Sequence, residues 1–193
     1  MARPKKKENL NPVRYRIENE FWKLMKKKSL KQITVSELVK NAECNRTTFY
    51  YHFDSVDDLA WKIIAENLPM ELPKIAKAYF TGKIENVKID SETMNVIERL
   101  SMLIGRDGSS ELANLAADAL KRMWIREFLR QGTKCDEELS YVFEFMASGI
   151  IGIVSRYGKS EDIVKLKKSI LLLNKLFSKP TLNLIESKQM TEG

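Results

Sequence analysis

Apolar side chains recur along most of this 193-residue chain at the spacing of an α-helix. In the segment 33–42, for example, Val35, Leu38, Val39 and Ala42 fall on one face. No two segments alternate polar and apolar residues as a pair of strands would. The pattern therefore predicts an all-α protein, for which about nine helices are expected.

Capping residues and prolines predict where the first helices begin. Asn11 and Pro12 open the first helix. Thr34 and Glu37 form a T-x-x-E capping box that starts a helix near Val35. Asn45 is the expected cap of a helix that begins at Arg46. Ser55 and Asp58 resemble another capping box, which would start a helix over 56–68.

The same reading gives the inward face of the first helix and the elements that follow. The apolar residues of the first helix expected to face inward are Tyr15, Ile17, Phe21, Leu24 and Met25. Pro69 and Pro73 interrupt the fourth helix, and residues 81–90 are expected to form a loop. The later helices are expected over 91–105, 109–131, 136–157 and 160–178.

The segment 45–53 is unusual among these helices because it is polar and aromatic. Phe49 and Phe53 lie four residues apart and are expected to point inward together. Its other side chains are of the kinds that bond phosphates and base edges. A short helix of this kind, joined by a tight turn to the helix before it, is how many proteins enter the major groove of DNA.

The charge of the chain is concentrated at the same end. Residues 1–53 carry 13 Lys and Arg against 5 Asp and Glu, a net of +8, whereas the whole chain is +7. Residues 54–193 therefore have a net charge of −1. A basic surface confined to one end favours a polyanionic partner. The basic run within residues 1–10 is read as a solvated tail or as an arm that contacts DNA.

Over roughly residues 11–65 the chain resembles the TetR family of bacterial transcription regulators. The residues that carry the resemblance are Ile33-Thr34-Val35, Ala42, the string Thr48-Phe49-Tyr50-Tyr51-His52-Phe53, and Leu59. The resemblance implies a three-helix, helix-turn-helix DNA-binding head over residues 11–54 after a flexible basic tail (1–10). Residues 55–193 would form a larger helical body that binds an effector and dimerises.

Two positions depart from the family pattern. The family usually has Gly at the turn, where this chain has Glu43 followed by Cys44. A left-handed backbone at Glu43 would cost about 1 kcal/mol relative to Gly, so the turn is expected to have a different shape. Val56 stands where the family often has a phosphate-binding Lys, so that contact is not expected here.

Geometry and the resemblance together assign roles in the DNA-reading segment. Thr48, Tyr50 and His52 match the family's phosphate contacts, and Thr34 matches a phosphate contact at a helix start. Arg46 could bind guanine through two hydrogen bonds. The full set of expected DNA-binding residues is Thr34, Asn45, Arg46, Thr47, Thr48, Tyr50, Tyr51 and His52.

The helix predicted over 136–157 is apolar nearly all round and is expected to be buried on more than one side, and the helix over 160–178 presents an apolar face. Packed against their copies, they would form a four-helix dimer interface, the alternative being an ordinary monomer core. A dimer would also let two heads read half-sites about 34–36 Å apart. The expected interface residues are Phe143, Ile150, Ile151, Val154, Ile163, Leu166, Ile170, Leu173 and Phe177.

The resemblance further implies a small-molecule effector that binds in the middle of the body and releases DNA. Methionine and aromatic side chains can line an adaptable apolar pocket, but they also serve as plain core. The candidate pocket residues are Met94, Met102, Met123, Trp124, Phe128, Tyr141 and Phe145. A closed cavity in the body would favour the small molecule, and an exposed apolar patch would favour a protein partner.

Other function classes receive little support from the sequence. An enzyme is not expected, because no acid–base pair, nucleophile elbow or phosphate loop is found. One His and two Cys do not make a metal site, and no cofactor is expected. No run reaches the length of a membrane span, and Cys44 and Cys135 suit a reduced, cytoplasmic protein. The resemblance implies a repressor of a palindromic operator, because most members of the family repress, and it leaves activation as the alternative.

Overall fold

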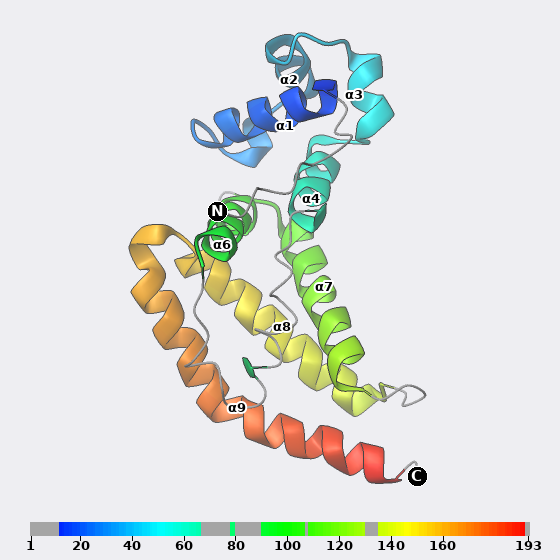
Figure 1. Ribbon diagram of the computed structural model, residues 1–193, viewed down its shortest axis with the longest axis vertical. Helices are drawn as coiled ribbons and strands as arrows, with labels where there is room; N and C mark the ends of the chain where they lie inside the picture. Colours follow the sequence, from blue (N-terminus) through cyan, green and yellow to red (C-terminus); the bar gives the residue numbers. More distant parts are fainter. Residues whose placement is uncertain (1–11, 67–77, 80–89, 107, 130–134, 192–193) are drawn as a thin grey trace, which may run out of the picture. The chain divides into compact units, whose positions relative to one another are not determined.

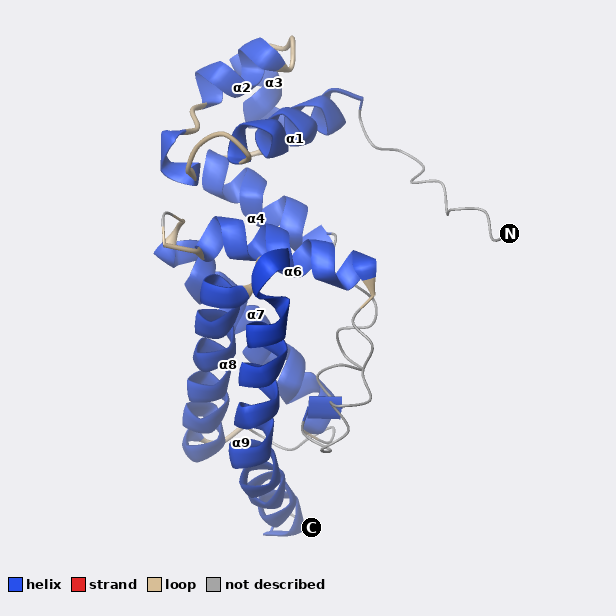
Figure 2. Cartoon of the chain, turned by 90° about the vertical axis from the view of Figure 1, so that its left-hand side faces the viewer, coloured by secondary structure: helices blue, strands red, loops and turns tan. Residues whose placement is uncertain are grey.

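A computed structural model of the chain describes residues 12–66, 78–79, 90–106, 108–129 and 135–191 (Figure 1). These ranges contain α-helices, 3₁₀ turns and connecting loops, and no strand (Figure 2). The all-α class is therefore confirmed. Eight α-helices are found in the described ranges, against the nine expected, and each of the eight coincides with a segment that the hydrophobic pattern predicts. The predicted loop at 81–90 and the two prolines before it lie outside the described residues, apart from Asp90.

The chain divides into two compact units, one ending at Glu66 and the other beginning at Asn67. The division falls after the fourth helix, whereas the resemblance puts the end of the DNA-binding head at residue 54. The described elements of the first unit are α1 (Pro12–Met25), the 3₁₀ turn η1 (Leu30–Gln32), α2 (Val35–Asn41), α3 (Arg46–His52) and α4 (Val56–Glu66).

The core of the first unit is apolar and closed. Helices α1, α2 and α3 pack against one another, and every one of them contributes a side chain that is fully buried. The side chains with 0–1% exposure are Ile17 and Phe21 of α1, Leu38 of α2, Ala42, Phe49 of α3, Phe53, and Leu59 and Ala60 of α4. The inward orientation predicted for Phe49 and Phe53 is thus confirmed.

Tyr15 is a correction to the predicted core. Its side chain is 53% exposed, whereas Ile17, Phe21, Leu24 and Met25 are buried as expected. The reason is the helical period: residues 17, 21 and 24 are spaced by four and three and share a face, and Tyr15 lies about 200° around the helix from Ile17.

The second unit is built around a central helix. Its described elements are α6 (Ser91–Ile104), α7 (Ser110–Phe128), α8 (Glu137–Tyr157), the 3₁₀ turn η3 (Ser160–Asp162) and α9 (Ile163–Thr191). Helix α8 contacts α6, α7 and α9. The starts of α6, α7 and α8 are fixed by Asp90, Ser109 and Asp136, whose side chains each accept a hydrogen bond from a backbone N–H in the first turn.

Helix α9 is longer than predicted and is a second correction. The sequence places its end at residue 178, two residues before Pro180, but the helix continues through Pro180 to Thr191. A proline inside a helix removes one backbone hydrogen bond and bends the axis. Thr181 and Ile185, 5% and 2% exposed, continue the buried face of the helix past the proline, and their burial offsets that loss.

Helix α8 also has the length and apolar composition of a membrane-crossing helix. That test is weak, because the core helix of a water-soluble protein passes it as well. In the second unit α8 lies among three other helices, and Leu139, Phe143, Met146, Ala147, Ile151 and Val154 are buried there.

Candidate nucleic-acid interface

Helices α2 and α3 are joined by a tight turn at Glu43 and Cys44. Glu43 has a φ of 51°, in the left-handed region. The backbone N–H groups of Glu43 and Cys44 bond to the carbonyls of Lys40 and Val39, at 3.3 and 2.9 Å. This is the pattern that usually ends a helix on Gly. The expectation of a differently shaped turn is therefore wrong: the chain adopts the glycine-type turn without a glycine.

The guanidinium group of Arg16 supports this turn from α1. Its Nε donates to the carbonyl oxygen of Ala42 at 3.0 Å, and its Nη2 donates to that of Glu43 at 3.4 Å. Carbonyl groups at the end of a helix have no partner within the helix. Arg16 satisfies two of them, which helps to hold Glu43 in its strained conformation.

Capping residues set the starts of both helices. Thr34 Oγ1 accepts a hydrogen bond from the N–H of Glu37 at 3.3 Å, as the predicted capping box requires. Asn45 Oδ1 accepts from both the N–H and the hydroxyl of Thr48, at 2.7 and 2.9 Å. Asn45 and Thr48, both expected to contact DNA, are thus hydrogen-bonded to each other. The side-chain nitrogen of Asn45 takes no part in these two bonds.

The buried anchors of α3 turn its remaining side chains outward. With Phe49 and Phe53 in the core, Tyr50 and Tyr51 are 54% and 81% exposed. Thr47 and Arg46 are exposed as well. The short helix therefore presents two phenolic rings and a guanidinium group on its surface.

His52 is placed differently from its neighbours. Its Nε2 atom is buried and has no hydrogen-bond partner among the described residues. Burial lowers the pKa of the imidazole below 6.5, and the nearby cations Arg14 and Lys62 lower it further. A neutral ring with Nε2 covered leaves Nδ1 as the one nitrogen that a phosphate could reach.

The end of α3 is held from α4. Lys62 Nζ donates to the carbonyl oxygen of His52 at 3.2 Å and pairs with Asp58 at 2.8 Å. Asp58 also accepts a hydrogen bond from the N–H of Asp54 at 2.8 Å, and its own N–H bonds to Ser55 Oγ. The predicted cap of the fourth helix is thus present, with the carboxylate bonded one residue earlier than in a capping box.

Ion pairs use only part of the positive charge in this unit. Arg14 pairs with Glu18 and Glu66, Lys23 with Glu20, and Lys28 with Glu37. Six other basic side chains of the unit are exposed and have no ion pair within the described ranges. They are Arg16, which donates to backbone carbonyls, and Lys26, Lys27, Lys31, Lys40 and Arg46. The basic residues before Pro12 lie outside the described part.

Among the described residues, two of the seven predicted effector residues, Tyr141 and Phe145, line the same groove. Trp124 is 1% exposed and packs as a core residue between the rings of Tyr79 and Phe143. Its ring centroid lies 6.3 Å from that of Tyr79 and 6.2 Å from that of Phe143. Met94, Met102, Met123 and Phe128 are half-buried. Tyr141 and Phe145, 64% and 63% exposed, belong to a separate feature on α8.

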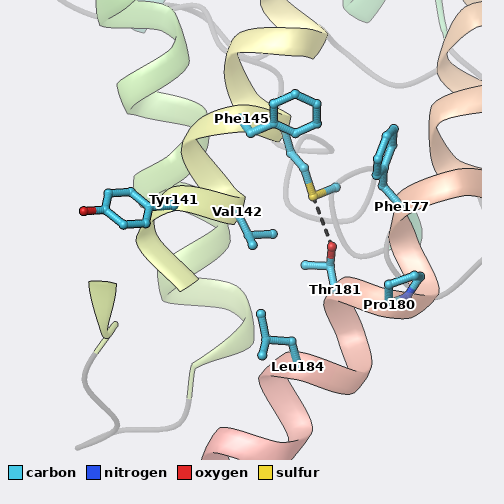
Figure 3. Close-up of a pocket in the computed structure, with 8 residues that line it drawn as sticks. Tyr141, Val142, Phe145, Phe177, Pro180, Thr181 and Leu184 are labelled. Carbon is cyan, nitrogen blue, oxygen red and sulfur yellow. Dashed lines mark hydrogen bonds between the residues drawn. The ribbon is translucent and has the colours of Figure 1, made fainter. Parts of the chain in front are cut away.

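That feature is an open apolar groove of about 400 Å³ between α8 and α9 (Figure 3). The rings of Phe145 and Phe177 pack edge to face, with their centroids 5.6 Å apart. Thr181 Oγ1 donates a hydrogen bond to Met146 Sδ at 3.3 Å. Figure 3 shows the Tyr141 ring pointing away from α9, and its hydroxyl donates to Glu137 at 2.5 Å. The residues around the groove are Tyr141, Val142, Phe145, Met146, Phe177, Pro180, Thr181 and Leu184.

The expected dimer residues divide into two groups. Phe143, Ile151, Val154 and Leu166 are 0–8% exposed within one chain and belong to its own core, which closes them to a second chain. Ile150, Ile163, Ile170, Leu173 and Phe177 are half-buried. The exposed large apolar side chains of these helices are Tyr141, Phe145, Val164, Leu172 and Leu176, none of which is in the list of expected interface residues.

Three polar residues that matter for this surface were missed in the sequence. Arg16 holds the turn, Lys62 holds the end of α3, and Ser36 Oγ accepts a hydrogen bond from Arg46 Nη2 at 2.5 Å. Arg16 and Lys62 lie far in sequence from their partners, so no local pattern marks them. The Ser36 bond links two helices, and only the turn between them brings the residues together.

The two cysteines are free. Burial raises the pKa of both the Cys44 and Cys135 thiols, although Arg16 partly opposes this at Cys44. A raised pKa lowers the thiolate fraction, and with it the reactivity, of both thiols. Among the described residues no three His, Cys, Asp or Glu side chains gather in the way a metal site needs.

Comparison with known proteins adds no family. The sequence matches no model of a protein family, and it matches no curated protein.

Proposed function

We propose that the chain is a DNA-binding transcription regulator of the TetR type. In this proposal α2, the turn and α3 form a helix-turn-helix, and α3 enters the major groove. The observation that carries it is the surface of α3: two exposed tyrosines and an arginine without an ion pair in the described residues, on a helix anchored by two buried phenylalanines. Hydroxyl and guanidinium donors of this kind bind phosphates and base edges.

The surroundings of α3 support the same proposal. The exposed, unpaired lysines of the first unit would add long-range attraction to a polyanion. Both ends of the helix are fixed, by Asn45 at the start and by Lys62 at the carbonyl of His52. A reading helix must keep its register on DNA, and such contacts give it a defined orientation.

The proposed regulator acts as a homodimer on a palindromic operator, with a small-molecule effector that releases it. Exposed apolar residues on α8 and α9 are a surface that a second copy could cover. The groove has the volume and apolar lining of a ligand site. Effector and DNA would weaken each other's binding by the same factor, as linkage requires. A cytoplasmic location belongs to this proposal.

A second candidate is control by a protein partner instead of a small molecule. It is favoured by one observation: the groove is open, and its rim carries exposed Tyr141 and Phe145. Surfaces of that kind are typical of protein contacts. Activation of transcription, in place of repression, is compatible with either mode of control.

The decisive experiment measures DNA binding directly. Duplexes are selected from a random-sequence library by the purified protein, and their affinity is measured by fluorescence anisotropy at two salt concentrations. We expect tight, salt-sensitive binding of the selected duplexes. Tyr50→Ala should weaken it about tenfold, the size expected when a hydrogen bond to a charged group is lost.

Tyr15→Ala is the matched control, because Tyr15 is 53% exposed and Tyr50 54%. It removes the same side chain from α1 and should leave the affinity within about twofold, as expected of a surface change outside the interface. Failure of any selected duplex to bind more tightly than bulk DNA would overturn the proposed function. Equal effects of the two substitutions would remove α3 from the interface.

A further inference from the structure

The hydrogen bond between α2 and α3 gives Arg46 a defined position on the surface. Arg46 is the first residue of α3, and its Nη2 donates to Ser36 Oγ in the first turn of α2, at 2.5 Å. Both side chains are exposed. A free arginine side chain has many rotamers, and a contact that selects one lowers the entropy lost when it binds.

The chemistry of the partner matters as much as the position. A carboxylate would hold Arg46 but would also neutralise it. A serine hydroxyl is neutral, so the guanidinium keeps its whole charge and its other N–H donors. Glu37, the acid next to Ser36, is already paired with Lys28. The arrangement orients Arg46 and leaves its charge available to an external partner.

Lys40 lies on the same edge. It follows Ser36 by four residues, so the two side chains are one turn apart on one face of α2. Lys40 is exposed and has no ion pair within the described residues. Arg46, Ser36 and Lys40 thus form a continuous polar edge, which we call the α2–α3 edge, with two uncompensated cations.

We propose that Ser36 is a positioning residue that orients Arg46 to read a base, and that Lys40 on the same edge contacts a DNA phosphate. This assignment rests on the proposed function. It predicts that sequence discrimination depends on the Ser36 hydroxyl, whereas Lys40 contributes to affinity for any sequence. Neither residue is among those that the sequence marked for DNA contact.

The test compares binding to the selected duplex and to random duplex, so that discrimination is measured as a ratio. Ser36→Ala should lower that ratio about fivefold, and Ser36→Thr, which keeps the hydroxyl, should keep it within about twofold. Arg46→Ala should lower the ratio about tenfold or more. In the double variant, Ser36→Ala should add nothing to Arg46→Ala, because it acts through that residue.

Lys40→Ala is the contrasting variant on the same edge. It should weaken binding to both duplexes by the same factor and reduce the slope of log affinity against log salt by about 1. Additive effects of Ser36→Ala and Arg46→Ala, or no effect of Ser36→Ala on the ratio, would overturn the positioning role. An unchanged salt slope for Lys40→Ala would overturn its phosphate contact.

Thermal melting of each variant separates these roles from stability. Thr34 caps α2, so Ser36→Ala and Lys40→Ala are expected to melt with the wild-type chain. If the wild-type protein and Ser36→Ala discriminate between the duplexes equally well, the role of Ser36 is contradicted and the proposed function still stands. Wild-type protein that fails to discriminate at all would sink the proposed function.

Discussion

The two units of this chain use their polar and apolar residues in opposite ways. In the first, the described core is wholly apolar, and polar side chains serve as caps or stand on the surface. All five buried polar side chains of the described residues lie in the second unit, whose exposed large apolar side chains include phenylalanine, valine and leucine, whereas those of the first unit are all tyrosines. The buried polar residues are Thr93, Ser101, Asn174, Ser178 and Thr181.

That contrast has a physical meaning. A buried polar group needs a partner, and in α9 the amide of Asn174 donates to the carbonyl of Tyr79, while Thr181 donates to Met146. Exposed Phe145 and Leu176 gain nothing from water and would gain from contact with another molecule. In the proposed function, the first unit would bind a charged, hydrated partner and the second an apolar one.

The largest expected effect tests whether the units are separate. Phe49→Ala removes a side chain with 0% exposure from the core of the first unit and should cost about 3–5 kcal/mol. Hydrogen exchange measured by mass spectrometry should show lost protection in α1–α4 and unchanged protection in α7–α9. Loss of protection in both sets of helices would mean that the chain unfolds as one unit.

The apolar surface of the second unit predicts the next largest effect. Phe145→Ser removes a ring that is 63% exposed and should weaken self-association by about 2 kcal/mol, close to thirtyfold, as hot-spot residues do. Sedimentation equilibrium gives the dissociation constant. Tyr15→Ser, at a side chain 53% exposed in the first unit, is the control and should change it little. A wild-type chain that stays monomeric at high concentration would contradict the interface.

The turn in the first unit gives a smaller effect of opposite sign. Glu43→Gly relieves a left-handed backbone at φ 51° and should raise the free energy of unfolding by about 1 kcal/mol. Glu43→Ala is the matched control, since Ala removes the carboxylate but keeps the Cβ atom. Urea denaturation followed by circular dichroism measures both. A gain shared equally by Ala and Gly would show that charge, and not backbone strain, is the cause.

The smallest effect is a pH dependence. The pKa of His52 is lowered in the folded chain, chiefly by burial, so below about 6.5 the unfolded chain binds more protons. The stability that neutral His52 supports is complete above that pH and is lost as pH falls toward the folded pKa. His52→Gln should flatten the difference in stability between pH 7 and pH 5 relative to wild type. An identical pH profile for the two proteins would place the imidazole in water.

Local hydrogen bonds made much of the fold predictable. Thr34, Asn45, Ser109 and Asp136 each accept from an N–H three residues ahead, so both members of the bond lie within one turn. The spacing of four residues between Phe49 and Phe53 fixed their common direction in the same way. These interactions need no distant partner, and the sequence alone determined them.

The tertiary structure decided which face of each helix is buried and which cationic side chains are held in place by hydrogen bonds. Helix α9 runs past Pro180 because burial of Thr181 and Ile185 outweighs a lost backbone bond. Phe143 and Leu166 lie in the core of one chain because α8 has neighbours on several sides. When a helix is apolar nearly all round, its sequence does not show which side packs within the chain and which side faces a partner. Arg16 bonds to the turn, and Arg46 bonds to Ser36. In both cases the partners are separated along the chain, and only the packing of the helices brings them together. The sequence determined the helices and the character of α3; contacts between helices decided the shape of the turn, the groove and the α2–α3 edge.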